Sequence, residues 1–308
     1  MGLRKIQTSQ VQFQGKLLTR LLISVWFSLG RLPFGLYRAV SSSLAVLLTL
    51  ILFALAKERR TVTLTNLKLC FPHVSPSARL LWAIQHMYFY LRTFLDRAWL
   101  WDGRSSVVRD RVQIENPEVL EALADGQPTI FLAPHFLGLD AAWSRLCMEV
   151  DMVTMYSNQK NPDLNSLILA GRSKFGKPLL LSRQQGVRPL VAAMKQGRPL
   201  YYLPDMDFGE RDSVFVSFFG VRAATVTAVS RLSKMLRARV IPVTTRYGSG
   251  RYTVRIHAAL EDFPLENEES STQYINHCIE DWVKDNVAQY LWLHKRFKTR
   301  PQGEPRIY

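Results

Sequence analysis

The chain has 308 residues, which is enough for one large α/β domain or two small ones. Its formal net charge of +15 favours anionic partners: nucleic acid, anionic lipid or a phosphorylated substrate. The cysteines, Cys70, Cys147 and Cys278, are far apart and form no metal-ligand spacing with histidines. The sequence therefore predicts no metal site and no disulfide scaffold, and it fits reduced thiols in a cytoplasmic environment.

The N-terminal part is mostly apolar over residues 17–56, with charges at Lys16, Arg20, Arg31 and Arg38. Residues 44–56 carry no charge, and basic residues follow at once at 57–60. We expect residues 1–60 to form a helical, membrane-associating segment and residues 61–308 to form an α/β domain. Basic residues flank the apolar run on both sides, so its orientation is not fixed. A membrane span, a helix lying in the cytoplasmic leaflet and a hairpin packed on the domain all remain open.

The next segment, residues 77–101, is predicted to be a long helix rich in aromatic side chains. These side chains could line a groove for an acyl chain, although core packing is the commoner reason for such a stripe. A strand is expected over residues 107–115, and a short helix over 117–124.

Residues 129–144 carry the principal candidate for chemistry. The apolar run Thr129–Ala133 predicts a buried strand, Pro134 ends it, and a turn at Gly138 precedes a helix that begins near Asp140. A turn can bring Asp140 back to His135, so that the carboxylate fixes the tautomer of the imidazole. His135 could then remove a proton from a substrate hydroxyl.

Strands and helices alternate through the rest of the chain. Strands are expected at 152–157, 179–181, 200–203, 240–245 and 252–260, with a further apolar run at 214–219. Helices are expected at 163–171, 186–196, 225–236 and 270–290. This order predicts an α/β fold with a mainly parallel central sheet flanked by helices. The loops at the carboxyl ends of such strands hold the active site, and we expect His135, Arg172 and Asp205 in them. The sequence has neither G-x-G-x-x-G nor a Walker lysine motif, which argues against nucleotide chemistry.

Five segments in this order resemble one family, the bacterial lipid A late acyltransferases, within the wider glycerol-phosphate acyltransferase group. They are LAPHFLGLDA (132–141), YSNQKNP (156–162) with GRSKFG (171–176), LPDMDFGERDSVFVSFFG (203–220), VIPV (240–243) and QYLWLHKRFKTRP (289–301). The resemblance covers residues 36–308 and implies a glycerol-phosphate-acyltransferase-like fold. Asp140 stands where many members have Glu.

The resemblance implies an acyl transfer from acyl carrier protein to a hydroxyl on a hydroxyacyl chain of a lipid A precursor, without a cofactor. It places the protein at the cytoplasmic face of the inner membrane, in contact with membrane lipids and not with nucleic acid. His135 and Asp140 carry over as the catalytic dyad and Arg172 as a contact to the acceptor, and Asp205 and Asp207 match an acidic block of less defined role.

Acceptor phosphates need fixed cations, for which we expect Arg172 and Lys174 first and Lys160 and Arg183 next. Backbone N–H groups of residues 136–139 are candidate donors to the developing oxyanion. Other readings remain: an acyltransferase acting on glycerophosphate, an ornithine lipid or a glycolipid; a thioester hydrolase; or a basic protein that binds membranes or nucleic acid without catalysis.

Overall fold

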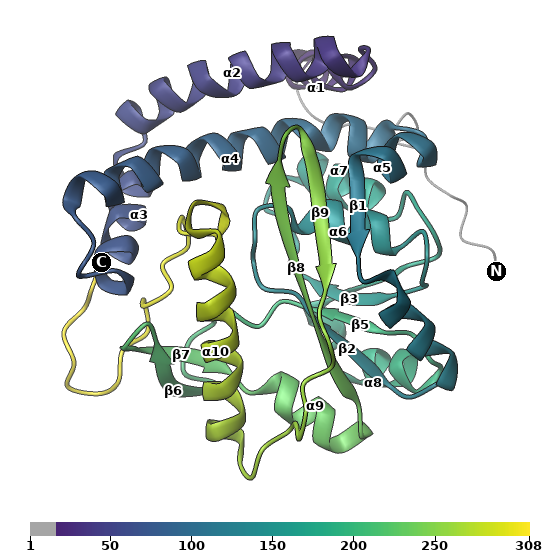
Figure 1. The fold of residues 1–308 in the computed structure, drawn as a ribbon, viewed down its shortest axis with the longest axis vertical. Coiled ribbons are helices and arrows are strands. Elements are labelled where there is room, and N and C mark those ends of the chain that lie inside the picture. The colour runs from purple at the N-terminus through teal and green to yellow at the C-terminus, as the bar shows by residue number, and fades with distance from the viewer. Residues whose placement is uncertain (1–16) are drawn as a thin grey trace.

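The computed structural model describes residues 17–308, and its centre is a seven-stranded sheet with helices on both faces (Figure 1). Residues 1–16 of the predicted N-terminal segment, Lys16 among them, lie outside the described residues. The strand order is β1-β9-β8-β2-β5-β3-β4, and neighbouring strands run parallel except for the antiparallel pair β8–β9. The predicted mainly parallel α/β fold is confirmed. The strands are β1 Val112–Glu115, β2 Thr129–Leu132, β3 Val153–Tyr156, β4 Leu179–Ser182, β5 Leu200–Tyr202, β8 Arg239–Gly248 and β9 Arg251–Ile256.

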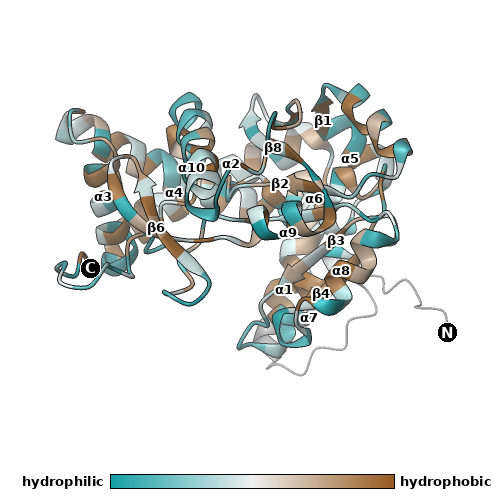
Figure 2. Cartoon of the chain, turned by 90° about the horizontal axis from the view of Figure 1, so that it is seen from below, coloured by the Kyte–Doolittle hydropathy of each residue, from teal (hydrophilic) through white to brown (hydrophobic). Residues whose placement is uncertain are grey.

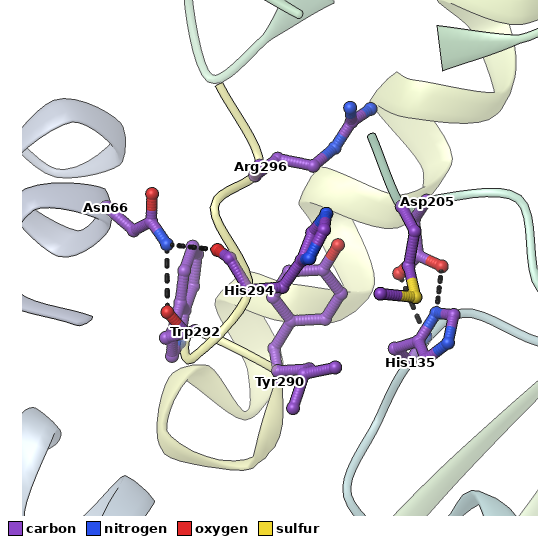
Figure 3. A pocket seen from close by; sticks show the side chains of 9 residues that line it. Asn66, His135, Asp205, Tyr290, Trp292, His294 and Arg296 are labelled. Carbon is purple, nitrogen blue, oxygen red and sulfur yellow. Dashed lines mark hydrogen bonds and ion pairs between the residues drawn. The ribbon is translucent and has the colours of Figure 1, made fainter. Parts of the chain in front are cut away.

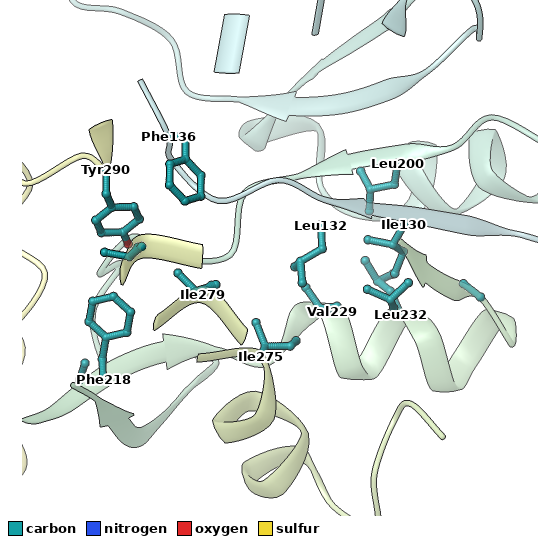
Figure 4. Packing of buried hydrophobic residues seen from close by; sticks show 14 of the residues in the cluster. Ile130, Leu132, Phe136, Leu200, Phe218, Val229, Leu232, Ile275, Ile279 and Tyr290 are labelled. Atoms are coloured by element: carbon teal, nitrogen blue, oxygen red, sulfur yellow. The ribbon is translucent and has the colours of Figure 1, made fainter. Parts of the chain in front are cut away.

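Alternate residues of the central strands enter two separate cores, as expected for a sheet covered on both faces. Ile130 and Leu132 of β2 pack with α8, α9 and α10, while Phe131 between them packs with α5, α6 and α7 (Figure 4). The helices are α5 Ser105–Arg111, α6 Leu139–Leu146, α7 Pro162–Arg172, α8 Arg188–Lys195, α9 Ala228–Leu236 and α10 Glu268–Asp285, with the 3-10 segment η2 at Pro117–Asp125.

Four further helices come before α5 in the described residues: α1 Leu17–Gly30, α2 Phe34–Leu55, α3 Lys57–Cys70 and α4 Pro76–Asp102. The predicted aromatic helix is α4, which Ser75 caps by accepting a hydrogen bond from the N–H of Ala78. Trp99 and Trp101 are buried in the core beneath α4. These two tryptophans therefore pack the interior, whereas Tyr90 is exposed, and of α4 only Arg97 lines the main cavity described below.

Two elements differ from expectation. The predicted strand 107–115 begins as helix α5, because Val108 and Arg111 are buried at helical spacing, and only Val112–Glu115 is extended. The predicted helix 225–236 starts later, at Ala228, because residues 221–226 form β7 (Val221–Val226). This strand pairs with β6 (Ser213–Phe218) in a separate hairpin. Its turn residues Phe219 and Gly220 both have positive φ, as a two-residue hairpin turn requires.

Candidate active site

The turn after β2 is held in place by the segment that follows α10. The N–H of Leu137 donates to the carbonyl of Gln289 (2.8 Å), and the N–H of Leu291 donates to the carbonyl of His135 (3.0 Å). The N–H groups of Phe136 and Leu139 donate within the turn itself. Three of the four predicted oxyanion donors, at Phe136, Leu137 and Leu139, are therefore already engaged.

His135 is held by Asp205, from the loop after β5. One carboxylate oxygen of Asp205 lies 2.7 Å from Nδ1 of His135, and the other accepts the backbone N–H of the same residue at 2.8 Å. Burial opposes the charge of Asp205, but His135, with a hydrogen bond from Tyr290, lowers the pKa of this carboxyl to about 2. An ionised carboxylate can only accept, so Nδ1 carries the proton and Nε2 is the basic nitrogen.

Asp140 is not the partner of His135, which corrects the expectation from the His-x4-Asp spacing. Its two oxygens accept Nε of Arg97 and Nε of Arg172, each at 2.9 Å. The Nη2 atoms of Arg97 and Arg172 lie 2.8 and 2.9 Å from the same oxygens, so each guanidinium contacts one oxygen of Asp140 through two of its nitrogens. Burial raises the pKa of Asp140, but Arg172 and Arg97 outweigh it and keep the pKa below its usual value. The physical reason is that Asp140 lies in the first turn of α6, which packs against α4 and α7, the helices that carry the two arginines.

A cavity of about 430 Å³ lies at the carboxyl ends of β2, β3 and β5. His135, Asp140, Arg97, Arg172 and Arg183 line it. The apolar part of its wall comes from residues that include Leu139, Trp143, Met155, Ile168, Leu203 and Phe208. The guanidinium of Arg183 stacks 3.9 Å from the centre of the Phe208 ring. The cavity thus combines one imidazole base, fixed cations and an apolar wall, as the transfer of an acyl group to an anionic acceptor would need.

A model of the bacterial lipid A biosynthesis acyltransferase family matches residues 5–299. The chain belongs to this family. A Haemophilus influenzae protein named lipid A biosynthesis acyltransferase is 32% identical over 258 residues, which cover 81% of this chain and 79% of that protein. The lipid A biosynthesis lauroyltransferase and myristoyltransferase of Escherichia coli are 29% and 31% identical. Those alignments cover 82% of this chain and 83% and 80% of the relatives. The predicted family is therefore confirmed, and this protein is an acyltransferase of lipid A biosynthesis.

In this lipid A acyltransferase, Asp207 holds the loop that carries Asp205. Its carboxylate accepts the N–H and the hydroxyl of Thr299 (2.6 and 2.7 Å), and its own N–H donates to Nε2 of His294 (2.9 Å). Burial and the nearby Arg296 lower the pKa of His294 to about 4, so this ring is neutral and can accept. Figure 3 shows His294 beside the His135–Asp205 pair. The predicted substrate residue Asp207 thus ties the loop to the C-terminal segment and does not line the cavity.

Two other residues that were predicted to bind the acceptor of this acyltransferase lie outside this group. Lys160 is exposed in the loop before α7, and Lys174 lies just after α7, and neither lines the cavity. Sequence reasoning missed Arg97, because it stands among the aromatic residues of α4, 43 positions before its partner Asp140. It also missed the pairing of Asp205 with His135, which joins residues 70 positions apart.

Proposed function

We propose that the protein transfers a fatty acyl chain from acyl carrier protein to the hydroxyl of a hydroxyacyl chain on a lipid A precursor. The observation that carries this proposal is the His135–Asp205 pair at a cavity lined by Arg97, Arg172 and Arg183. Family membership supports lipid A as the acceptor. Relatives named lauroyltransferase, myristoyltransferase and palmitoleoyltransferase support a fatty acyl chain as the group that is transferred.

In the reaction that we propose, Nε2 of His135 removes the proton of the acceptor hydroxyl as its oxygen attacks the thioester carbon. The tetrahedral intermediate then collapses, the carbon–sulfur bond breaks, and the imidazolium returns the proton to the leaving thiolate. General base catalysis of this kind contributes about 10²–10⁴-fold to a rate. Asp205 keeps the reactive tautomer and stabilises the imidazolium, the role that the sequence had suggested for Asp140.

The arginines at the cavity supply fixed positive charge. Asp140 neutralises only one of the two guanidinium groups that it binds, so the Arg97–Asp140–Arg172 group keeps a net positive charge. Guanidinium binds phosphate at two points, which suits the phosphates of a lipid A precursor. With three of the four turn N–H groups engaged, these arginines are also donors that we propose for the oxyanion.

We propose that the protein acts at the cytoplasmic face of the inner membrane, with residues 1–60 as the membrane-associating part and residues 61–308 as the acyltransferase domain. The apolar helix α2, which has a mean hydropathy of 2.0 and is long enough to cross a bilayer, supports this location. The net charge of +15 supports contact with anionic lipids and with the acidic carrier protein.

The deciding experiment is mass spectrometry of lipid A from cells with and without the protein, and from cells that carry His135→Ala. The wild-type gene should add the mass of one acyl chain, and the variant should not. In a purified assay, acyl carrier protein and coenzyme A thioesters are compared as donors. An unchanged lipid A profile, together with acylation of glycerophosphate or another lipid, would replace the proposed acceptor. Full activity of His135→Ala would exclude the base.

A further inference from the structure

The outer surface of α1 and α2 is apolar and faces away from the domain. On α2, the buried residues Tyr37, Ser41, Ala45 and Thr49 recur every fourth position, as one stripe of a helix does. The aliphatic hydroxyls of the stripe, on Ser41 and Thr49, donate to carbonyls of α2 itself. Only 17% of the most apolar 18-residue stretch of α2 is buried, so most of this helix is free to contact lipid or another protein.

Most of the exposed residues of this surface are leucine, isoleucine or valine, and the others in the described part of the two helices are glycine, alanine, serine and one arginine. On α2 they include Leu36, Val40, Val46, Leu47, Leu50, Ile51 and Leu55, and on α1 they include Leu21, Leu22 and Val25. An exposed apolar patch of this extent marks a surface that meets a protein or a membrane. Arg38, Lys57 and Arg59 are exposed at the two ends of α2, where they can meet lipid phosphates.

The first end of α2 is bonded to the buried core of the domain. The hydroxyl of Tyr37 donates to Asp96 of α4 at 2.8 Å, in an environment closed to solvent. Asp96 also accepts the hydroxyl of Tyr252 in β9 (2.6 Å) and the indole N–H of Trp99 (2.7 Å). Asp96 is also paired with the buried Arg92, so separating Tyr37 from Asp96 would break a buried hydrogen bond and uncover this ion pair, which is costly.

The second end of α2 is tied to the domain as well. The guanidinium of Arg60 donates to the carbonyl of Phe53 at 2.7 Å, which joins α2 to α3. Asn66 of α3 donates to the carbonyls of Trp292 and His294, both at 2.8 Å, in the segment that also holds the catalytic loop. Figure 1 shows the result: α2 runs lengthwise over α4 and does not project from the domain.

A helix of 22 residues is about 33 Å long, close to the hydrocarbon thickness of a bilayer of about 30 Å. If α2 crossed the membrane while packed on α4, it would take Arg92 and Asp96 of α4, both buried and charged, to the same depth. If it left α4, it would break the bond between Tyr37 and Asp96. Both ends therefore stay on the side of the membrane where the domain lies.

We infer that α1 and α2 bind the membrane in its plane, with the apolar outer face inserted into one leaflet of anionic phospholipid and no segment of α2 crossing. This inference rests on the proposed membrane location and specifies its geometry. It decides between the alternatives that the sequence left open. It also sets the long side of α4, from which Arg97 reaches the cavity, parallel to the lipid surface that supplies the acceptor.

The test places one cysteine at each end of α2, Gly35→Cys and Lys57→Cys, in the full-length chain with Cys278→Ser. Both positions are exposed, and no atom lies within 4 Å of a side chain built at Gly35. A membrane-impermeant maleimide should label both cysteines in inverted vesicles and neither in intact spheroplasts. Labelling of one position from each side would establish a span and overturn the inference.

The inserted face is tested by binding to vesicles of phosphatidylethanolamine and phosphatidylglycerol. The double variant Leu47→Lys/Leu50→Lys should bind at least about tenfold more weakly. Met235→Lys on α9 should bind like the wild type. Met235 is a matched control because it is 58% exposed, against 54% and 64% for the two leucines. Equal binding by all three proteins, or a wild-type chain that forms dimers through this face without binding vesicles, would refute the inference. Neither readout uses acyl transfer, so a wrong acceptor would not affect the result.

Discussion

The substitution Asp205→Asn tests whether the partner of His135 is Asp205, as in the structure, or Asp140, as the His-x4-Asp spacing predicted. In the structure, the carboxylate of Asp205 accepts two N–H groups of His135, one from the backbone (2.8 Å) and one from the ring (2.7 Å). The amide of Asn has one oxygen and one NH₂ group, so it can accept only one of them and sets a donor against the other. Either the turn loses its bond or Nδ1 must lose its proton, which moves the proton to Nε2 and removes the base.

The size of the effect follows from that tautomer. A general base contributes about 10²–10⁴-fold, so we expect kcat to fall by this factor while KM for the acceptor changes little. Loss of a hydrogen bond to a charged group costs about 1.5–3 kcal/mol, so the variant should also unfold more easily. Circular dichroism at the assay temperature separates slow catalysis from unfolded protein.

Asp140→Asn is the comparison that makes the assay decisive. This change removes the charge that Arg97 and Arg172 share, and it leaves the bond between His135 and Asp205 in place. We expect its main effect on KM for the phosphorylated acceptor, through misplaced guanidinium groups. The assay measures initial rates against acceptor concentration with saturating acyl carrier protein thioester. If Asp205→Asn kept a wild-type kcat while Asp140→Asn lost kcat at unchanged KM, the partner assignment would be wrong.

Three further predictions concern the same region. Gly171→Ala should lower the free energy of unfolding by about 1–3 kcal/mol, because the added Cβ would lie 2.2 Å from the Trp101 ring. At Gly35 an added Cβ has no atom within 4 Å, so Gly35→Ala is the control, and thermal unfolding is measured for both variants. Because His135 outweighs the effect of burial and gives Asp205 a folded pKa of about 2, below the usual 3.8, the carboxylate contributes about 2 kcal/mol of stability above pH 4, and this is lost as the pH falls towards 2. Acid unfolding should show this loss for the wild type and not for Asp205→Asn. Arg172→Lys should raise KM for a phosphorylated acceptor about tenfold, since an ammonium cannot bind in two places, and an unchanged KM would refute the phosphate role.

Local pattern determined most of the fold. The alternation of short apolar runs with helical segments predicted the parallel sheet, and the positions of β2, β3, β4, β5 and β8 follow from runs bounded by Pro, Gly or polar residues. The strand, turn and helix around His135 were likewise predictable, since Pro134 and Gly138 mark the turn. The exceptions are two short elements: β7 is extended because it pairs with β6 in a hairpin, and α5 is helical because Val108 and Arg111 are buried at helical spacing, so packing overrides their local preference.

The composition of the site could be predicted from the sequence, but its pairing could not. His135, Asp140, Arg172, Arg183 and Asp205 were all identifiable, because loops at one edge of a parallel sheet converge there. Which carboxylate meets the imidazole depends on how α4, α7 and the loop after β5 pack around the turn, and these contacts join residues 32 to 70 positions apart. The spacing of residues in the sequence shows which side chains share a face only within one helix or strand. Only the tertiary structure therefore assigned Asp205 to the base and Asp140 to the arginines.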